Sequence, residues 1–196
     1  MFFKKNKVKR TKQINRITDT KLELQAQVQE ILNQEQRIDL DINKFYDYML
    51  EVLKAYNCSF GYQRSDSKKH GHFKIKTDRV TGEETWEIKI ERNDNDAGKI
   101  YTLIHETTHL LNNHVQNREL TKKQAEVVAD TVALHFIYKF NLKEELNNSS
   151  VSKKWDVDQY TNTYIKNMSL SNQRKELIIK QIDSTIDYLD KGIYSL

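Results

Sequence analysis

The stretch Ile104-His105-Glu106-Thr107-Thr108-His109-Leu110-Leu111 carries the strongest signal in this 196-residue sequence. Histidines four positions apart on a helix project from one face, so both imidazoles can bind one tetrahedral Zn²⁺ ion. Glu106 lies beside the metal rather than on it, where it can take a proton from a zinc-bound water. Apolar residues at positions 100, 103, 104, 110 and 111 predict that this helix packs into a core. The pattern therefore favours a metal site over two solvent-facing histidines.

A third protein ligand is expected, because catalytic zinc usually has three ligands and an open position. His114 is one candidate. The metzincin pattern, however, places its third histidine six residues after the second one, which is Val115 here. We therefore interpret His114 as a polar helix-end residue. Glu126 is favoured, because it lies in an apolar helical stretch where a carboxylate needs a partner such as a metal. Asp130, four residues later, can accept a hydrogen bond from the second nitrogen of a ligating histidine. A row of solvent-facing carboxylates is the alternative interpretation.

The surrounding pattern predicts an α+β fold that is mainly helical, with a small antiparallel β-hairpin before the helix that carries the histidines. Zero prolines and five glycines leave few positions that interrupt helices. Capping residues and alternation place strands at 58–62, 72–77 and 84–92. Helices are expected over 17–36, after Asp39 or Asp41, and over 97–113, 121–140, 157–168 and 171–189, with a loop at 147–154.

Composition excludes several classes of protein. Hydrophobic residues make up 37% of the chain, and no apolar run approaches the roughly 18 residues of a membrane span. Cys58 is the lone cysteine, which excludes an internal disulfide framework. Lysines follow Met1-Phe2-Phe3 directly, without the apolar region of a secretory signal. We expect a cytoplasmic protein.

Charge divides the chain unevenly. Residues 1–16 contain seven basic side chains and no acidic one, although the whole chain has a net charge of only +4. We expect residues 1–16 to form a disordered tail, residues 17–57 to form N-terminal helices, and residues 58–196 to form the core with a helical tail, with 17–196 as one domain. The tail gives a weak signal for nucleic-acid binding. Its candidate contacts are Lys4, Lys5, Lys7, Lys9 and Arg10.

The segments HETTHLLNNH (105–114) and AEVVADTVALHF (125–136) resemble the ImmA/IrrE-type zincin metallopeptidases. The peptidase domain of ArdC-like proteins from mobile genetic elements is the most similar type, over roughly residues 58–142. The second segment resembles the family pattern E-x-x-A-[ND]-x-[FV]-A at Glu126, Ala129, Asp130, Val132 and Ala133. The resemblance implies one zinc ion per chain held by His105, His109 and Glu126, with Glu106 as general base. It also implies that the strand before the histidine helix lines the cleft, where a peptide can pair with it.

Two aspects of the resemblance are incomplete. ArdC-like proteins usually carry a single-stranded-DNA-binding domain before the peptidase, and 57 residues are too few for it. Zincins of this type commonly hold the developing oxyanion with a Tyr, His or Arg. Tyr160 and Tyr164, four residues apart on a predicted helix, are the candidates here.

Three functional hypotheses follow. The first is a zinc-dependent metallopeptidase that cleaves one protein partner, such as a repressor or restriction-related protein, and is encoded on a phage, plasmid or conjugative element. The second is an antirestriction or regulatory protein that keeps a zincin scaffold and acts by contact. The third is a helical DNA-associated protein that works through its basic N-terminus. Metal content separates the first two from the third, and substitution of Glu106 separates the first from the second.

Overall fold

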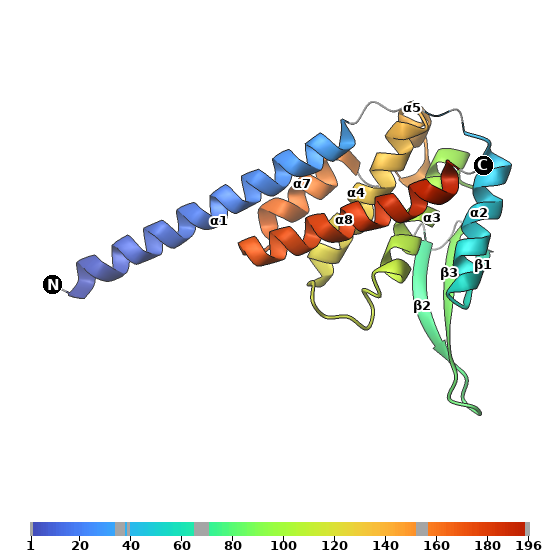
Figure 1. The fold of residues 1–196 in the computed structure, drawn as a ribbon, viewed down its shortest axis with the longest axis horizontal. Coiled ribbons are helices and arrows are strands. Elements are labelled where there is room, and N and C mark those ends of the chain that lie inside the picture. The colour runs from blue at the N-terminus through green and yellow to red at the C-terminus, as the bar shows by residue number, and fades with distance from the viewer. Residues whose placement is uncertain (1, 34–37, 39, 65–70, 152–156, 195–196) are drawn as a thin grey trace.

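The computed structural model describes residues 2–33, 38, 40–64, 71–151 and 157–194. Figure 1 shows a helical body with a small sheet at one side. Its elements are α1 (Phe2–Leu32), α2 (Ile42–Ala55), β1 (Cys58–Gln63), β2 (Gly71–Thr77), β3 (Glu84–Glu91), α3 (Asp96–Leu111), α4 (Lys122–Lys139), α5 (Lys143–Asn147), α7 (Val157–Asn167) and α8 (Asn172–Ile193). The mainly helical α+β fold is therefore confirmed. No described helix combines the length and the apolar character that crossing a membrane requires.

The helix starts follow the capping chemistry of the sequence. Asp41 caps α2, because its carboxylate accepts hydrogen bonds from the backbone amides of residues 43 and 44. Thr121 and Gln124 form a capping box at the start of α4. Asn95 caps α3, because its side-chain oxygen accepts a hydrogen bond from the backbone amide of Gly98. These local signals fix where the two helices of the histidine and glutamate segments begin.

The sheet has the strand order β1-β3-β2. β2 and β3 form the predicted antiparallel hairpin, and β1 lies parallel to β3 on its other side. Ile88 and Ile90 of β3 point into the core and are fully buried. Lys74 and Glu87 occupy the opposite, outer face, where they pair across the two strands. The central strand is thus β3, and β2 lies at an edge.

Helix α4 runs through the middle of the helical body (Figure 1). Val127, Val128 and Val132 on this helix are fully buried and belong to one hydrophobic core shared by nearly all elements. Leu24 and Val28 of α1 join that core, so α1 packs onto the same body as α4, α7 and α8. The single core holds α3 and α4 against each other, and this fixes the relative positions of the side chains that they carry.

The N-terminus differs from the prediction of a disordered tail over residues 1–16. Residues 2–32 form one continuous helix, and its first half projects beyond the body in Figure 1. The sequence has no glycine or proline before Gly61, so nothing interrupts the helix at residue 16, and lysine, arginine and glutamine favour helix. The predicted loop over 147–154 is also partly wrong: residues 148 and 149 are not helical, but Asn147 ends the short helix α5 and residues 150 and 151 are helical. Residues 152–154 of that loop lie outside the described residues.

Candidate metal centre

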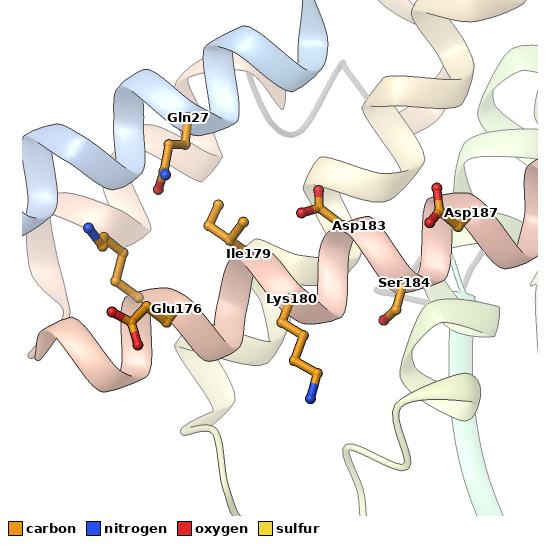
Figure 2. A pocket seen from close by; sticks show the side chains of 8 residues that line it. Gln27, Glu176, Ile179, Lys180, Asp183, Ser184 and Asp187 are labelled. Atoms are coloured by element: carbon orange, nitrogen blue, oxygen red, sulfur yellow. The ribbon is translucent and has the colours of Figure 1, made fainter.

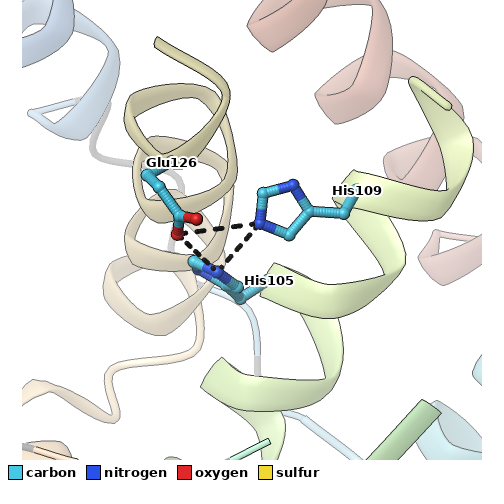
Figure 3. Close-up of side chains that lie close together, drawn as sticks. All are labelled: His105, His109 and Glu126. Carbon is cyan, nitrogen blue, oxygen red and sulfur yellow. Dashed lines mark hydrogen bonds and ion pairs between the residues drawn. The ribbon is translucent and has the colours of Figure 1, made fainter. Parts of the chain in front are cut away.

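His105 and His109 of α3 meet Glu126 of α4 at one point (Figure 3). The two Nε2 atoms are 3.1 Å apart. Oε2 of Glu126 lies 3.4 Å from Nε2 of His105 and 3.8 Å from Nε2 of His109. Ligands about 2.05 Å from a tetrahedral zinc ion lie roughly 3.3 Å from one another, so these separations fit such an ion. Among the described residues, no other trio of His, Cys, Asp or Glu side chains converges in this way.

His105 is supported from behind by a buried acid. Its Nδ1 lies 2.9 Å from Oδ1 of Asp130, which is 2% exposed. The hydroxyl of Tyr101 donates to the same carboxylate oxygen over 2.7 Å. This carboxylate lies on the Nδ1 side of the ring, which is the side that faces away from the Glu126 carboxylate. A neutral ring with its proton on Nδ1 would direct the lone pair of Nε2 at the candidate metal position, as a ligating histidine requires.

His109 is supported by a neutral chain of side chains. Its Nδ1 lies 2.9 Å from Nδ1 of His114, and Nε2 of His114 lies 3.0 Å from Oε1 of Gln181 on α8. With the amide oxygen of Gln181 as acceptor, Nε2 of His114 is the donor and its Nδ1 is an acceptor. Nδ1 of His109 must then carry the proton, which leaves a lone pair on Nε2. Burial lowers the pKa of His114 to about 4, so this ring is neutral at pH 7.

His114 therefore has a partner that the sequence reasoning did not identify, since we had interpreted it as a polar helix-end residue. The geometry comes from the way α3 ends. Asn113 adopts a positive φ of 49°, and the amide of His114 donates to the carbonyl oxygen of His109. This is a Schellman turn, which reverses the chain and places the His114 ring against that of His109. The Asn112-Asn113 pair at the helix end is the signal that predicts such a turn.

The charges around the three ligand atoms favour a cation. Burial by itself lowers the pKa of His105, but Asp130 and Glu126 outweigh burial and raise that pKa well above its usual value. Burial by itself raises the pKa of Glu126, but His105 and His109 outweigh it and lower that pKa. Without a metal ion, the neighbouring carboxylates thus favour a proton on the imidazole of His105. A metal ion would occupy the same position with a larger positive charge. The trio can hold a metal ion, and its donor set fits zinc.

Glu106 lies in the same cleft but outside the ligand trio. The cleft has a volume of about 750 Å³ and is lined by residues that include Gly71, Glu106, His109, Glu126 and Tyr164. A Cβ atom at Gly71 would lie 2.3 Å from Cγ2 of Thr102 and 3.2 Å from Oε1 of Glu106. Strand β2 therefore approaches α3 so closely that only glycine fits at this position. The sequence reasoning had assigned no role to Gly71.

The expectation for the cleft strand needs a correction. The strand immediately before α3 is β3, which is paired on both sides and cannot accept another strand. The cleft is instead lined by Gly71, His72 and Phe73 of the edge strand β2. The hairpin reverses the chain, so the strand earlier in sequence lies nearer to the site.

The remaining site candidates fall in two groups. Tyr164 on α7 lines the cleft, one helical turn after Tyr160, whose side chain lies outside what the structure describes. Lys4, Lys5, Lys7, Lys9 and Arg10 lie in the projecting half of α1, and their side chains are also outside the described part of the structure.

A second hollow lies between α1 and α8 (Figure 2). Gln27 faces it from α1, and Ile179 and Asp183 face it from α8. Burial, followed by the charge of Asp187, raises the pKa of Asp183. The residues that line this hollow include no histidine or cysteine, so it offers no counterpart to the metal centre.

Comparison with known proteins leaves the metal centre as the main guide to function. The sequence matches no family model, and the searches of curated proteins and of solved structures give no significant match. The resemblance to ImmA/IrrE-type zincins therefore stays a prediction from the two helical segments.

Proposed function

We propose that this protein is a zinc-dependent metallopeptidase with one zinc ion per chain. The observation that carries the proposal is the convergence of His105, His109 and Glu126, with Asp130 beside Nδ1 of His105 and His114 beside Nδ1 of His109. A binding protein needs no carboxylate beside such a trio. Glu106 supplies one, in the same cleft and within one residue of a ligand.

The roles of the side chains follow from their positions. His105, His109 and Glu126 would hold zinc, which when bound acts as a Lewis acid and lowers the pKa of water. Glu106 accepts the proton of the attacking water and passes it to the leaving amine. Tyr164 stabilises the oxyanion from the cleft wall, and Tyr160 is the alternative one turn earlier on α7.

The substrate in this proposal is one specific protein. Its support is the resemblance to regulatory zincins of mobile elements. We propose a repressor or a restriction-related protein as the partner, a phage, plasmid or conjugative element as the genetic context, and the cytoplasm as the location. Burial raises the pKa of the Cys58 thiol to about 11, so this lone cysteine is unreactive and suits that compartment.

The test compares wild type with Glu106→Gln, loaded with zinc and expressed beside the proteins encoded near its gene. The amide cannot accept a proton, so fragmentation should fall by at least about a hundredfold while zinc stays bound. Glu176→Gln on α8, far from the ligand trio in sequence, is the matched control and should cleave normally. Mass spectrometry follows the fragments, and elemental analysis follows the zinc.

The same variant tests the alternative function, an antirestriction or regulatory protein that acts by contact. If Glu106→Gln binds zinc and supports the host phenotype as well as wild type does, proteolysis is not the activity. The scaffold then works as a binding module.

A further inference from the structure

A row of basic side chains crosses the outer face of the sheet beside the cleft. His72, Lys74 and Lys76 alternate along β2 with residues of the inner face. Side chains of Lys74 and Lys76 are 48% and 49% exposed, and with Lys89 of β3 they surround the carboxylate of Glu87. Three lysines around one carboxylate leave a surplus of two positive charges. The outer face of this hairpin is therefore basic.

The same strand leads directly out of the cleft. Gly71, His72 and Phe73 line the cleft together with Glu106. β2 pairs with β3 on one side, and no described strand pairs with its other side. Backbone groups on an edge of this kind can accept an extended peptide as an additional strand. In Figure 1, β2 runs from α3 to the tip of the hairpin, so a bound segment would extend along that direction.

We propose that β2 selects a partner segment whose side chains alternate between acidic and apolar residues. The proposal rests on the proposed peptidase function, and it adds the class of substrate. Side chains of an added strand lie about 4.5–5.5 Å from those directly opposite on the same face. The outer-face positions would therefore meet Lys74 and Lys76, and the inner-face positions would meet Phe73 and Ile75.

The positions of Lys74 and Lys76 along β2 determine where the acidic residues of a bound peptide lie relative to the peptide bond that is cleaved. Lys74 and Lys76 are one and three residues beyond Phe73, the last residue of β2 that lines the cleft. At a rise of about 3.3 Å per residue, these side chains lie about 3 and 10 Å further along the strand. The two acidic residues thus lie to one side of the cleaved bond and are separated by a single residue.

A peptide fits this surface better than a nucleic acid does. Glu87 neutralises part of the lysine charge, and a nucleic acid gains no contact with the apolar inner-face residues Phe73 and Ile75. A peptide strand uses the backbone edge, the basic face and the apolar face together. Binding of a polyanion through the same lysines is the competing outcome in the test.

The experiment measures the affinity of labelled ten-residue peptides for zinc-loaded Glu106→Gln protein by fluorescence anisotropy. One peptide alternates glutamate with valine, and its partner alternates lysine with valine. We expect the acidic peptide to bind at least about tenfold more tightly at low salt, because each facing charge pair contributes up to roughly fivefold. High salt should reduce that ratio, because exposed charges are screened.

Lys76→Gln provides the test on the chain, and Lys89→Gln is its matched control. Both changes remove a lysine contact of Glu87, but Lys89 lies on the central strand, away from the free edge. Lys76→Gln should reduce the acidic preference about threefold to fivefold, and Lys89→Gln should leave it within twofold. Thermal unfolding of each variant shows whether both are folded to the same extent.

The outcomes separate this inference from the proposed function. Equal affinity for both peptides, or equal effects of Lys76→Gln and Lys89→Gln, would overturn the inference even if wild type cleaves peptides. Tighter binding of a 20-base-pair DNA duplex than of the acidic peptide, lost in Lys76→Gln, would overturn it in favour of a polyanion site. Selective binding of the acidic peptide without cleavage by zinc-loaded wild type would retain the inference and reject the peptidase.

Discussion

Glu87 on the sheet and Glu126 in the candidate metal centre are both poorly exposed carboxylates, but different kinds of side chain surround them. The side chain of Glu87 is 6% exposed and lies among Lys74, Lys76 and Lys89. The side chain of Glu126 is 21% exposed, and among the described residues its ion-pair partners are the imidazoles of His105 and His109. Lysine is a permanent cation at neutral pH, and imidazole is neutral when it acts as a ligand. The sheet thus neutralises its buried acid with its own side chains, while in the α3–α4 pocket the metal ion of the proposed function would take that role.

We expect the largest difference between substitutions of these two glutamates to be in zinc content. Glu126→Gln removes an anionic ligand, so zinc affinity should fall by more than about a hundredfold, beyond the loss typical of outer-shell changes. Glu87→Gln should keep about one zinc per chain, because the carboxylate of Glu87 pairs with lysines and is not one of the candidate ligands. Elemental analysis and competition with a chelating dye measure both variants. If Glu126→Gln keeps its zinc while Asp130→Asn or His114→Ala loses it, the third ligand is assigned wrongly.

The residues behind the two histidines should have the next largest effect. Asp130→Asn and His114→Ala each remove the group that fixes a ligand tautomer, so zinc affinity should fall about tenfold to a hundredfold. Gln181→Leu should resemble His114→Ala, because both break the chain from α8 to His109. His114→Gln should recover part of the affinity, since an amide oxygen can accept the Nδ1 proton. Equal zinc affinity in wild type and Gln181→Leu would contradict the idea that Gln181 orients His109 through His114.

A smaller effect is expected in the pH dependence of stability. Burial raises the pKa of Glu87, but Lys76 and Lys74 outweigh it and lower that pKa to about 2. A carboxyl whose folded pKa is lower than its unfolded value of about 4.3 stabilises the fold above that value. Its contribution should be lost as the pH falls from about 5 to about 2. Urea unfolding across this range should show a shallower pH dependence for Glu87→Gln, and parallel curves would contradict the effect.

The smallest effect concerns the projecting half of α1. Deleting residues 1–16 removes seven basic side chains and should leave the metal centre unchanged, because α1 joins the core through Leu24 and Val28. We expect only weak, sequence-independent binding of DNA by the full chain, falling steeply with salt as counterions are released. Electrophoretic mobility shifts in 50 and 200 mM salt measure it. Unchanged affinity after the deletion would show that these residues do not bind DNA.

The sequence was informative where a signal is local. The spacing of His105 and His109 needs only a helix, and Glu126 stood out as an acid in an apolar helical stretch. The parallel pairing of β1 with β3 was missed, because it joins residues 28 apart such as Cys58 and Trp86. The contact of His114 with His109 was missed, because it depends on the turn at Asn113 and on Gln181 67 residues away. The contacts that were missed depend on residues far apart in the sequence, and the chemistry of the side chains does not reveal such pairings.

The contact between His114 and Gln181 also has a consequence for how the protein is made. Helix α8 is synthesised after every other element of the site, and domains fold from the N-terminus as they emerge from the ribosome. A growing chain therefore already contains His105, Glu106, His109 and Glu126 but lacks the acceptor that orients His109. The ring of His109 acquires its fixed tautomer only when α8 docks. In the proposed zinc enzyme, the full affinity for metal would therefore be reached only after α8 has docked and the rest of the fold exists.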